Sequence, residues 1–116
     1  MEKGLLQEAT QHIPDPDIIV NLFDLSVVWL SPKAQEMSGY SNKHLEAEII
    51  RVIDIFGFSE EYAKDIVWKD AQEKGTREFI AKTKSGKKYK ITLNFFAFHF
   101  GDIDYRVGKI IEKKEL

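Results

Sequence analysis

The segment from Lys88 to Phe100 constrains the fold of this chain most, because its side chains alternate as they do in a long β-strand. Successive residues of a strand point to opposite faces of the sheet, so every second residue shares a face. One face is apolar as far as Ala97, with Tyr89, Ile91, Leu93, Phe95 and Ala97. The other face begins polar and then becomes aromatic, with Lys88, Lys90, Thr92, Asn94, Phe96, Phe98 and Phe100. The pattern predicts an inner strand whose aromatic second half must also be covered.

Four further strands are expected from β-branched and aromatic runs bounded by turn residues. They are 17–23, 27–30, 77–82 and 102–113. Residues 24–26 are short enough to join the first two strands as a hairpin. A Lys-Ser-Gly-Lys sequence at 84–87 and Gly101-Asp102 supply the later turns.

Helical spacing of apolar residues predicts the helices. A short one is expected over Glu2–His12, and another starts at Ser31-Pro32, a capping residue with proline in the first turn, and ends before Gly39. Residues 41–55 are expected to be helical in two pieces, with Leu45, Ile49, Ile50, Ile53 and Phe56 on one side. A longer helix is expected over Glu60–Lys74, capped by Ser59 and ended by Gly75.

The order of these elements predicts an α+β fold. It consists of a five-stranded antiparallel sheet, with short helices and one longer helix packed on one face. The N-terminal helix is expected on the other face. We therefore divide the chain into an N-terminal amphipathic segment, 1–13, and a core domain, 14–116, a size that suits one compact domain.

Composition excludes several classes of function. The chain has no cysteine, which removes disulfides, thiolate metal sites and cysteine nucleophiles and fits a reducing compartment. Its net charge of -2 gives no sign of a nucleic-acid partner. No apolar run is long enough for a membrane helix, and residues 1–12 do not form a signal peptide. We expect a cytoplasmic domain without a membrane segment.

The same order of motifs resembles the PAS family of sensory domains over roughly 16–112. The most specific match is Gly39-Tyr40-Ser41 followed by Leu45, which is similar to the family's GYS..EL segment. The Lys84–Lys87 turn resembles the hairpin before the family's long strand. The family often has asparagine where Ser31 stands, and it often ends its sheet with Asp-Ile-Thr, whereas this chain has Glu112-Lys113-Lys114.

The resemblance allows a cofactor, and the sequence argues against two of them. A haem-binding PAS domain usually has a histidine on the long helix, and 60–74 has none. Light-sensing relatives form a cysteinyl-flavin adduct, which a chain without cysteine cannot form. His12, His44 and His99 lack metal-ligand spacing, so no metal site is expected. The identity of any cofactor stays unknown, and no catalytic residue is expected.

A small-molecule cavity between sheet and helices is the functional site that the resemblance implies. Its expected wall is mostly apolar. The residues assigned to it are Trp29, Ile53, Phe56, Phe58, Tyr62, Ile66, Tyr89, Ile91, Leu93 and Phe95. A solid core without ligand is the alternative for the same residues.

The second expected surface is a homodimer interface. Three phenylalanines on the outer sheet face would be an unusual apolar patch if they were exposed. An apolar stripe on the N-terminal helix could cover them, either from the same chain or from a second copy. The residues assigned to this interface are Leu5, Leu6, Ala9, Ile13, Phe96, Phe98 and Phe100.

Taken together, these features favour a regulatory module over an enzyme. The expected role is to sense a small molecule, or to dimerise, and so to control an output domain in the same or a partner chain. In the resembled family such outputs are commonly histidine kinases or diguanylate cyclases. A small α+β enzyme with an apolar pocket and a ligand-free interaction module are the alternatives.

Overall fold

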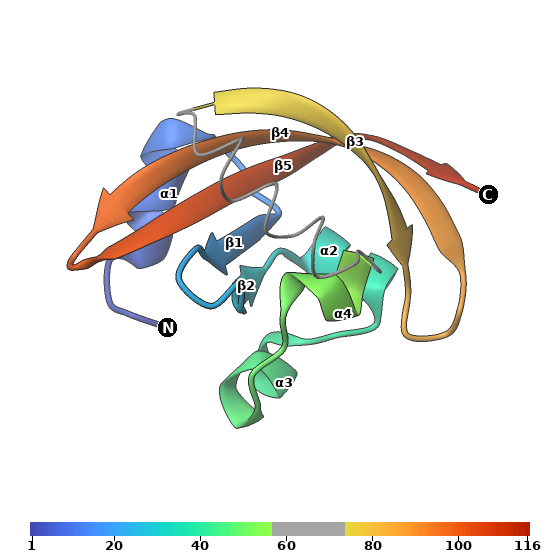
Figure 1. Ribbon diagram of the computed structural model, residues 1–116, viewed down its shortest axis with the longest axis horizontal. Helices are drawn as coiled ribbons and strands as arrows, with labels where there is room; N and C mark the ends of the chain where they lie inside the picture. The colour runs from blue at the N-terminus through green and yellow to red at the C-terminus, as the bar shows by residue number, and fades with distance from the viewer. Residues whose placement is uncertain (57–73) are drawn as a thin grey trace.

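The chain folds as a curved antiparallel sheet with helices on both sides (Figure 1). The computed structural model describes residues 1–56 and 74–116. The elements are α1 (Leu5–His12), β1 (Ile18–Asn21), β2 (Val27–Leu30), α2 (Pro32–Ser38), α3 (Asn42–Ala47), α4 (Val52–Phe56), β3 (Lys74–Lys82), β4 (Lys88–Phe100) and β5 (Ile103–Glu115). The strands follow the order β2-β1-β5-β4-β3, which confirms the predicted five-stranded α+β fold.

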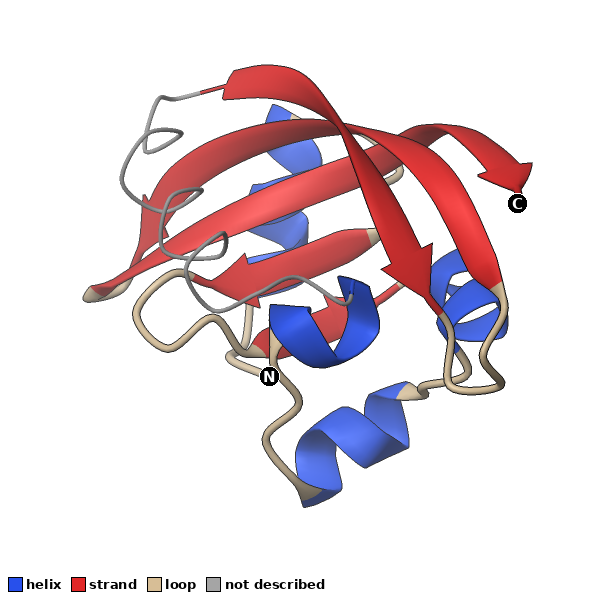
Figure 2. Ribbon diagram, turned by 45° about the vertical axis from the view of Figure 1, so that its right-hand side comes forward, coloured by secondary structure: helices blue, strands red, loops and turns tan. Residues whose placement is uncertain are grey.

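The sheet separates two apolar clusters. The inner face packs against α2 and α4, and the outer face packs against α1 (Figure 2). The inner cluster includes Ile18, Val20, Ala34, Met37, Ile55, Phe79, Ile91, Leu93 and Ile110. The outer cluster includes Leu5, Ala9, Ile13, Ile19, Phe98, Tyr105 and Val107. Strand β4 contributes alternate residues to both clusters, as its sequence predicts.

The short helices begin and end where the sequence indicates. Ser31 caps α2 by accepting a hydrogen bond from the backbone N–H of Ala34, and Pro32 stands in the first turn. Gly39 ends α2 with φ of 82°, a left-handed conformation that glycine adopts without a steric penalty. Ser41 and His44 form a reciprocal cap at the start of α3.

The predicted helix over Glu60–Lys74 lies outside the described residues except for its last position. There the prediction is wrong, because Lys74 and Gly75 belong to β3, which begins earlier than expected. Gly75 pairs with Phe95 across the strands and does not end a helix. Strand β5 is also longer at its carboxyl end than predicted, because it stays paired with β4 as far as Glu115.

Residues 48–51 separate α3 from α4, so the two helical pieces expected over 41–55 do not share one continuous apolar side. The backbone N–H of Val27 donates to the carbonyl of Ile50 (2.8 Å), and Ser26 bridges to Arg51, so this piece runs beside β2. Neighbours in an extended segment point in opposite directions. Ile50 is therefore buried and Ile49 is 75% exposed, which corrects the prediction that both lie on the apolar side.

Candidate functional site

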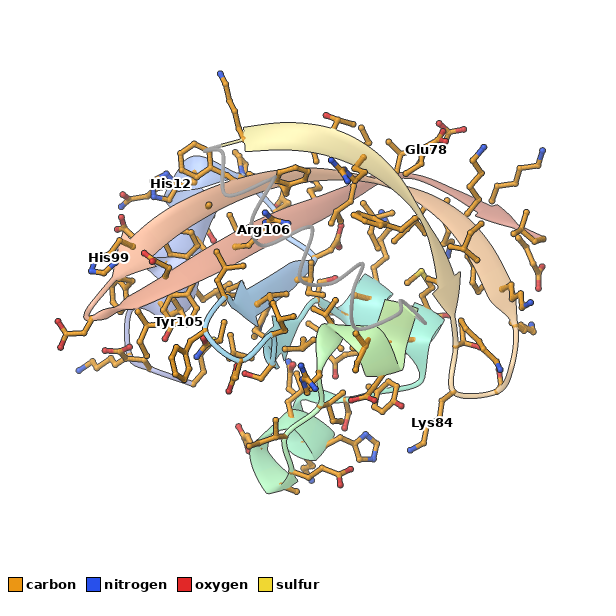
Figure 3. All side chains as sticks on the ribbon, viewed as in Figure 1. His12, Glu78, Lys84, His99, Tyr105 and Arg106 are labelled. Atoms are coloured by element: carbon orange, nitrogen blue, oxygen red, sulfur yellow. The ribbon has the colours of Figure 1, made fainter. Side chains whose placement is uncertain are left out.

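A buried arginine marks the inner face of the sheet near its middle (Figure 3). Arg106 of β5 pairs with Val20 of β1 and with Ala97 of β4. Directly paired residues share a face, and Val20 belongs to the inner cluster. Only 7% of Arg106 is exposed. A cation with five N–H donors therefore stands on a face that is otherwise largely apolar.

The guanidinium of Arg106 lies against an aromatic ring. Its central carbon is 4.5 Å from the centroid of the Phe95 ring, within the range of a cation–π contact. The ring fits there because its partner across the strands is Gly75: a β-carbon at that position would lie 2.7 Å from Cζ of Phe95. The absence of a side chain at Gly75 thus leaves room for the Phe95 ring, and this ring contacts the guanidinium of Arg106.

A second glycine, in β5, leaves room for side chains of β1 and β4 next to this site. A β-carbon on Gly108 would lie 3.0 Å from Ile18 and 3.1 Å from Leu93. Such contacts are tighter than side chains accept without a shift. Side chains of Ile18 and Leu93 therefore fill the inner face around Gly108, and Arg106 places a charge close by.

Some residues assigned to the cavity wall lie on this inner face. Ile91 and Leu93 are buried in the inner cluster, Tyr89 packs against it, and Phe95 lies beside Arg106. Ile53 is half-buried on α4, and Phe56 is its last residue. Phe58, Tyr62 and Ile66 lie outside the described residues. Whether these residues contact a ligand stays a prediction.

Trp29 does not line the inner face, which corrects its assignment. It packs against the outer cluster because β2 contains a bulge. Ile19 pairs with Trp29 and Val20 with Val27, so Val28 is an extra residue between them. A bulge of this kind reverses the alternation of a strand. The Trp29 indole instead borders a surface pocket of about 440 Å³ with Leu6, Pro16 and Pro32.

The sequence interpretation missed Arg106, since it expected only apolar and aromatic groups in the cavity. The sequence Tyr105-Arg106-Val107 does contain an indication of it, a charged residue between two apolar ones in a predicted strand. A charged residue between two apolar ones usually points to solvent from a sheet with one covered face. Strand β5 is central, and both of its faces are buried around Arg106, so the same alternation buries the charge.

The phenylalanine end of the outer face is covered by the chain's own N-terminal helix. Leu5 and Ala9 of α1 are 1% and 0% exposed and lie in one cluster with Phe98. The His12 ring stacks on Phe96 with 4.5 Å between centroids and 11° between planes. Same-chain packing thus covers the phenylalanines. Phe98→Glu would put a charge inside this cluster and is expected to destabilise the fold.

A buried carboxylate connects three elements at the edge of the inner face. Asp17, which precedes β1, accepts a hydrogen bond from Ser31 Oγ (2.7 Å) and another from the backbone N–H of Ile110 in β5 (2.7 Å). Ser31 Oγ in turn accepts from the N–H of Ala34 in α2. Asp17 is 5% exposed. Its two oxygens hold the middle of β5, at Ile110, against the start of α2.

The three histidines do not come together in a metal site. His12 stacks on Phe96, His44 takes part in the cap of α3, and Nδ1 of His99 lies 2.8 Å from a carboxylate oxygen of Asp104. Within 1–56 and 74–116, no group of three or more histidines and carboxylates is placed to bind a metal ion. None of the helices in these two ranges has the length and apolar character needed to cross a membrane.

His99 is expected to titrate above its usual range. The hydrogen bond with Asp104 raises the pKa of His99 above 6.5, because it favours the charged imidazolium. A raised pKa in the folded state means that the small stabilisation is complete below the unfolded value and is lost as pH rises through the folded value. An NMR titration should place the His99 midpoint above 6.5, and Asp104→Asn should lower it. An unchanged midpoint in that variant would contradict this account.

Comparison with known proteins gives the fold a name. No protein-family model matches the chain. No curated protein matches it either. Solved structures do match: a PAS domain from a two-component sensor histidine kinase superposes with a TM-score of 0.70 at 12% identity, covering 94% of this chain and 96% of that one. The chain has a PAS fold.

Two further PAS domains support this assignment. One from Desulfitobacterium hafniense has a TM-score of 0.68 at 14% identity and covers 87% of this chain and 93% of that one. The PAS domain of the fruit-fly ELK potassium channel has a TM-score of 0.60 at 16% identity, with 95% and 98% covered. Identities this low establish the PAS fold and leave ligand and output to other arguments.

Proposed function

We propose that this PAS domain is a cytoplasmic sensory module that responds to a small anionic molecule and catalyses no reaction itself. The observation that supports the proposal is Arg106, a cation on the inner face of the sheet. The output domain that it would control is a histidine kinase or a diguanylate cyclase, in the same or a partner chain. A solved PAS domain of similar shape belongs to a sensor histidine kinase, which supports that part of the proposal.

Arg106 favours a ligand with a carboxylate or a similar planar anion. The guanidinium offers its donors in a rigid fork that matches two oxygens of one carboxylate. The contact with the Phe95 ring would limit the rotation of the guanidinium, which would reduce the entropy lost on binding. Register places Arg77 on the same face, since it pairs with Leu93. Apolar contacts would come from the predicted wall, including Tyr89, and the anion would lie toward the arginines.

The proposal of an anionic ligand is tested by native mass spectrometry of the purified chain, followed by identification of any molecule that dissociates from it. We expect an acid of low molecular mass. Arg106→Gln should weaken its binding by about tenfold or more, because a charge-assisted pair in a buried site is lost. Lys43→Gln, an exposed change on α3, is the matched control and should retain it. A bound molecule without an anionic group would overturn the ligand class whatever the variants do.

The proposed signal is a change in population between two states. A ligand shifts such an equilibrium only if it binds one state better than the other. The Asp17 hydrogen bonds connect the middle of β5, at Ile110, to α2. A shift at the inner face can therefore reach β5 through them and pass along that strand to its carboxyl end. We propose this end as the place where the output is coupled.

A homodimer is the second part of the proposal, with 1–13 as the dimerisation segment on the core 14–116. The side chains available to it are the half-buried ones of the outer layer, Leu6, Phe96 and Phe100. The fully buried members of the predicted interface, such as Leu5 and Phe98, would support that surface from beneath. Sedimentation should show two chains for the wild type and a folded monomer for Leu6→Glu. A monomeric wild type at about 100 μM would end this part of the proposal.

A further inference from the structure

The positive charge of this acidic chain is concentrated at one end of the sheet. Residues 79–101 contain five lysines and no aspartate or glutamate, while the rest of the chain has twelve lysines and arginines against nineteen acids. The lysines belong to the hairpin between β3 and β4 and to the strand that follows it. Figure 3 shows Lys84 near this hairpin, far from His99 at the opposite end.

Three of these lysines and a fourth from β5 share the outer face of the sheet. In β4 the residues with the parity of Phe98 face outward, which places Lys88 and Lys90 there. Their partners across the strands are Lys82 in β3, opposite Lys88, and Lys114 in β5, opposite Lys90. All four are exposed. We call Lys82, Lys88, Lys90 and Lys114 the lysine platform.

The platform opposes the stability of the sheet. Like charges placed directly opposite each other on neighbouring strands destabilise the pairing. Here two such pairs are adjacent, Lys82 with Lys88 and Lys90 with Lys114. The carboxylate Oε2 of Glu78 lies 3.4 Å from Nζ of Lys90, and this ion pair relieves part of the repulsion. An anionic partner would relieve the rest.

The residues beside the platform on the three strands indicate which kind of partner fits it. Next to the platform, Thr92 of β4 pairs with Glu78 of β3 on one side and with Glu112 of β5 on the other. Two negative side chains therefore lie across the sheet beside the lysines. The bulge in β5 leaves Ile111 55% exposed, and Ile80 beside Lys90 is 49% exposed. A lipid surface or a nucleic acid is negative throughout, and the glutamates would repel it. A protein segment can place acids, apolar side chains and a base in that order.

We propose that the lysine platform is a docking surface for a protein segment with carboxylates over the lysines and apolar side chains over Ile80 and Ile111. The surface is separate from the proposed ligand site, which lies on the inner face. It also lies beyond α1, which packs on the phenylalanine end of the outer face. Complementary charge would fix the register of the segment, and the isoleucines would add apolar contact area.

The test uses two synthetic peptides of about 16 residues, a length that spans this part of the sheet when extended. One is rich in glutamate with leucines interspersed, and the other has the same charge with serine in place of leucine. Vesicles containing phosphatidylglycerol and a single-stranded oligonucleotide are the competing probes. Binding to the isotope-labelled full chain is followed by NMR. We expect amide shifts at 80–92 and 111–114, and tighter binding of the leucine peptide than of the other three probes.

Charge-reversal variants then locate the site. Lys88→Glu with Lys90→Glu should weaken binding about tenfold or more, while Lys3→Glu with Lys43→Glu, which changes net charge equally at exposed positions elsewhere, should change it less than about threefold. Lys88→Glu alone should raise the melting temperature by about 1–4 °C while it weakens binding, because it removes one repulsive pair. Absence of peptide binding, equal weakening by both double variants, or preference for vesicles or the oligonucleotide would each overturn the proposal.

Discussion

Replacing Phe98 by alanine is expected to lower the free energy of unfolding by about 3–4 kcal/mol, which is the range for a phenylalanine removed from a well-packed core. Phe98 is 7% exposed and joins α1 to the sheet. Its ring lies 5.1 Å from that of His12 and 5.9 Å from that of Tyr105, centroid to centroid. Alanine would leave a cavity between α1 and the sheet.

The measurement is urea denaturation followed by circular dichroism, with Phe23→Ala as the matched control. Phe23 is 93% exposed in the turn between β1 and β2, so the same change should alter stability by less than about 0.5 kcal/mol there. If the two variants lost the same stability, α1 would not pack on the sheet as described. Loss of dimerisation without loss of stability would assign Phe98 to an interface between chains instead.

The strands that could be predicted well are those with their own turn signals. Strand β4 begins and ends where its alternation predicts, because a glycine with positive φ stands in the turn at each end, at Gly86 and Gly101. The first core helix is equally local, with a capping serine before Pro32 and a left-handed glycine after Ser38. In these cases the physical cause lies within a few residues of its effect, so one sequence is enough.

Predictions failed where pairing between distant segments changes the phase. Trp29 faces outward because Val28 is an extra residue opposite β1, and Ile49 is exposed because residues 48–51 run beside β2. Neither bulges nor bridges follow from the periodicity of the segment that contains them. The assignments of inner and outer residues therefore hold along β4 and fail at β2 and before α4.

The charged groups of the site were the hardest to predict. Arg106 becomes buried only because β5 takes the central position in the sheet, and the sequence does not state the strand order. The sequence places Asp17 only at the start of a strand, and its main partners lie 14 and 93 residues further along the chain. A polar residue is identified as part of a site only when its partners are known, and these come from tertiary structure.

Replacing Asp17 by alanine is expected to cost about 3 kcal/mol of unfolding free energy. The carboxylate is 5% exposed and accepts two hydrogen bonds of 2.7 Å, from Ser31 Oγ and from the N–H of Ile110. Its removal leaves both donors buried without their acceptor, and a buried group that loses its partner costs about 1–3 kcal/mol. Asp17→Asn keeps the shape but turns an N–H₂ group toward one of the donors, so it should recover only part of the loss.

The control for this change is Glu36→Ala, which removes one negative charge from an exposed position on α2 and should alter stability by less than about 0.5 kcal/mol. Urea denaturation gives the stabilities, and hydrogen exchange gives the local effect. The amide of Ile110 should exchange faster in Asp17→Ala, because its acceptor is gone, while that of Val107, in the middle of β5, should change only through global stability. A loss below about 1 kcal/mol would mean that water replaces the carboxylate and that Asp17 does not hold β5 to α2.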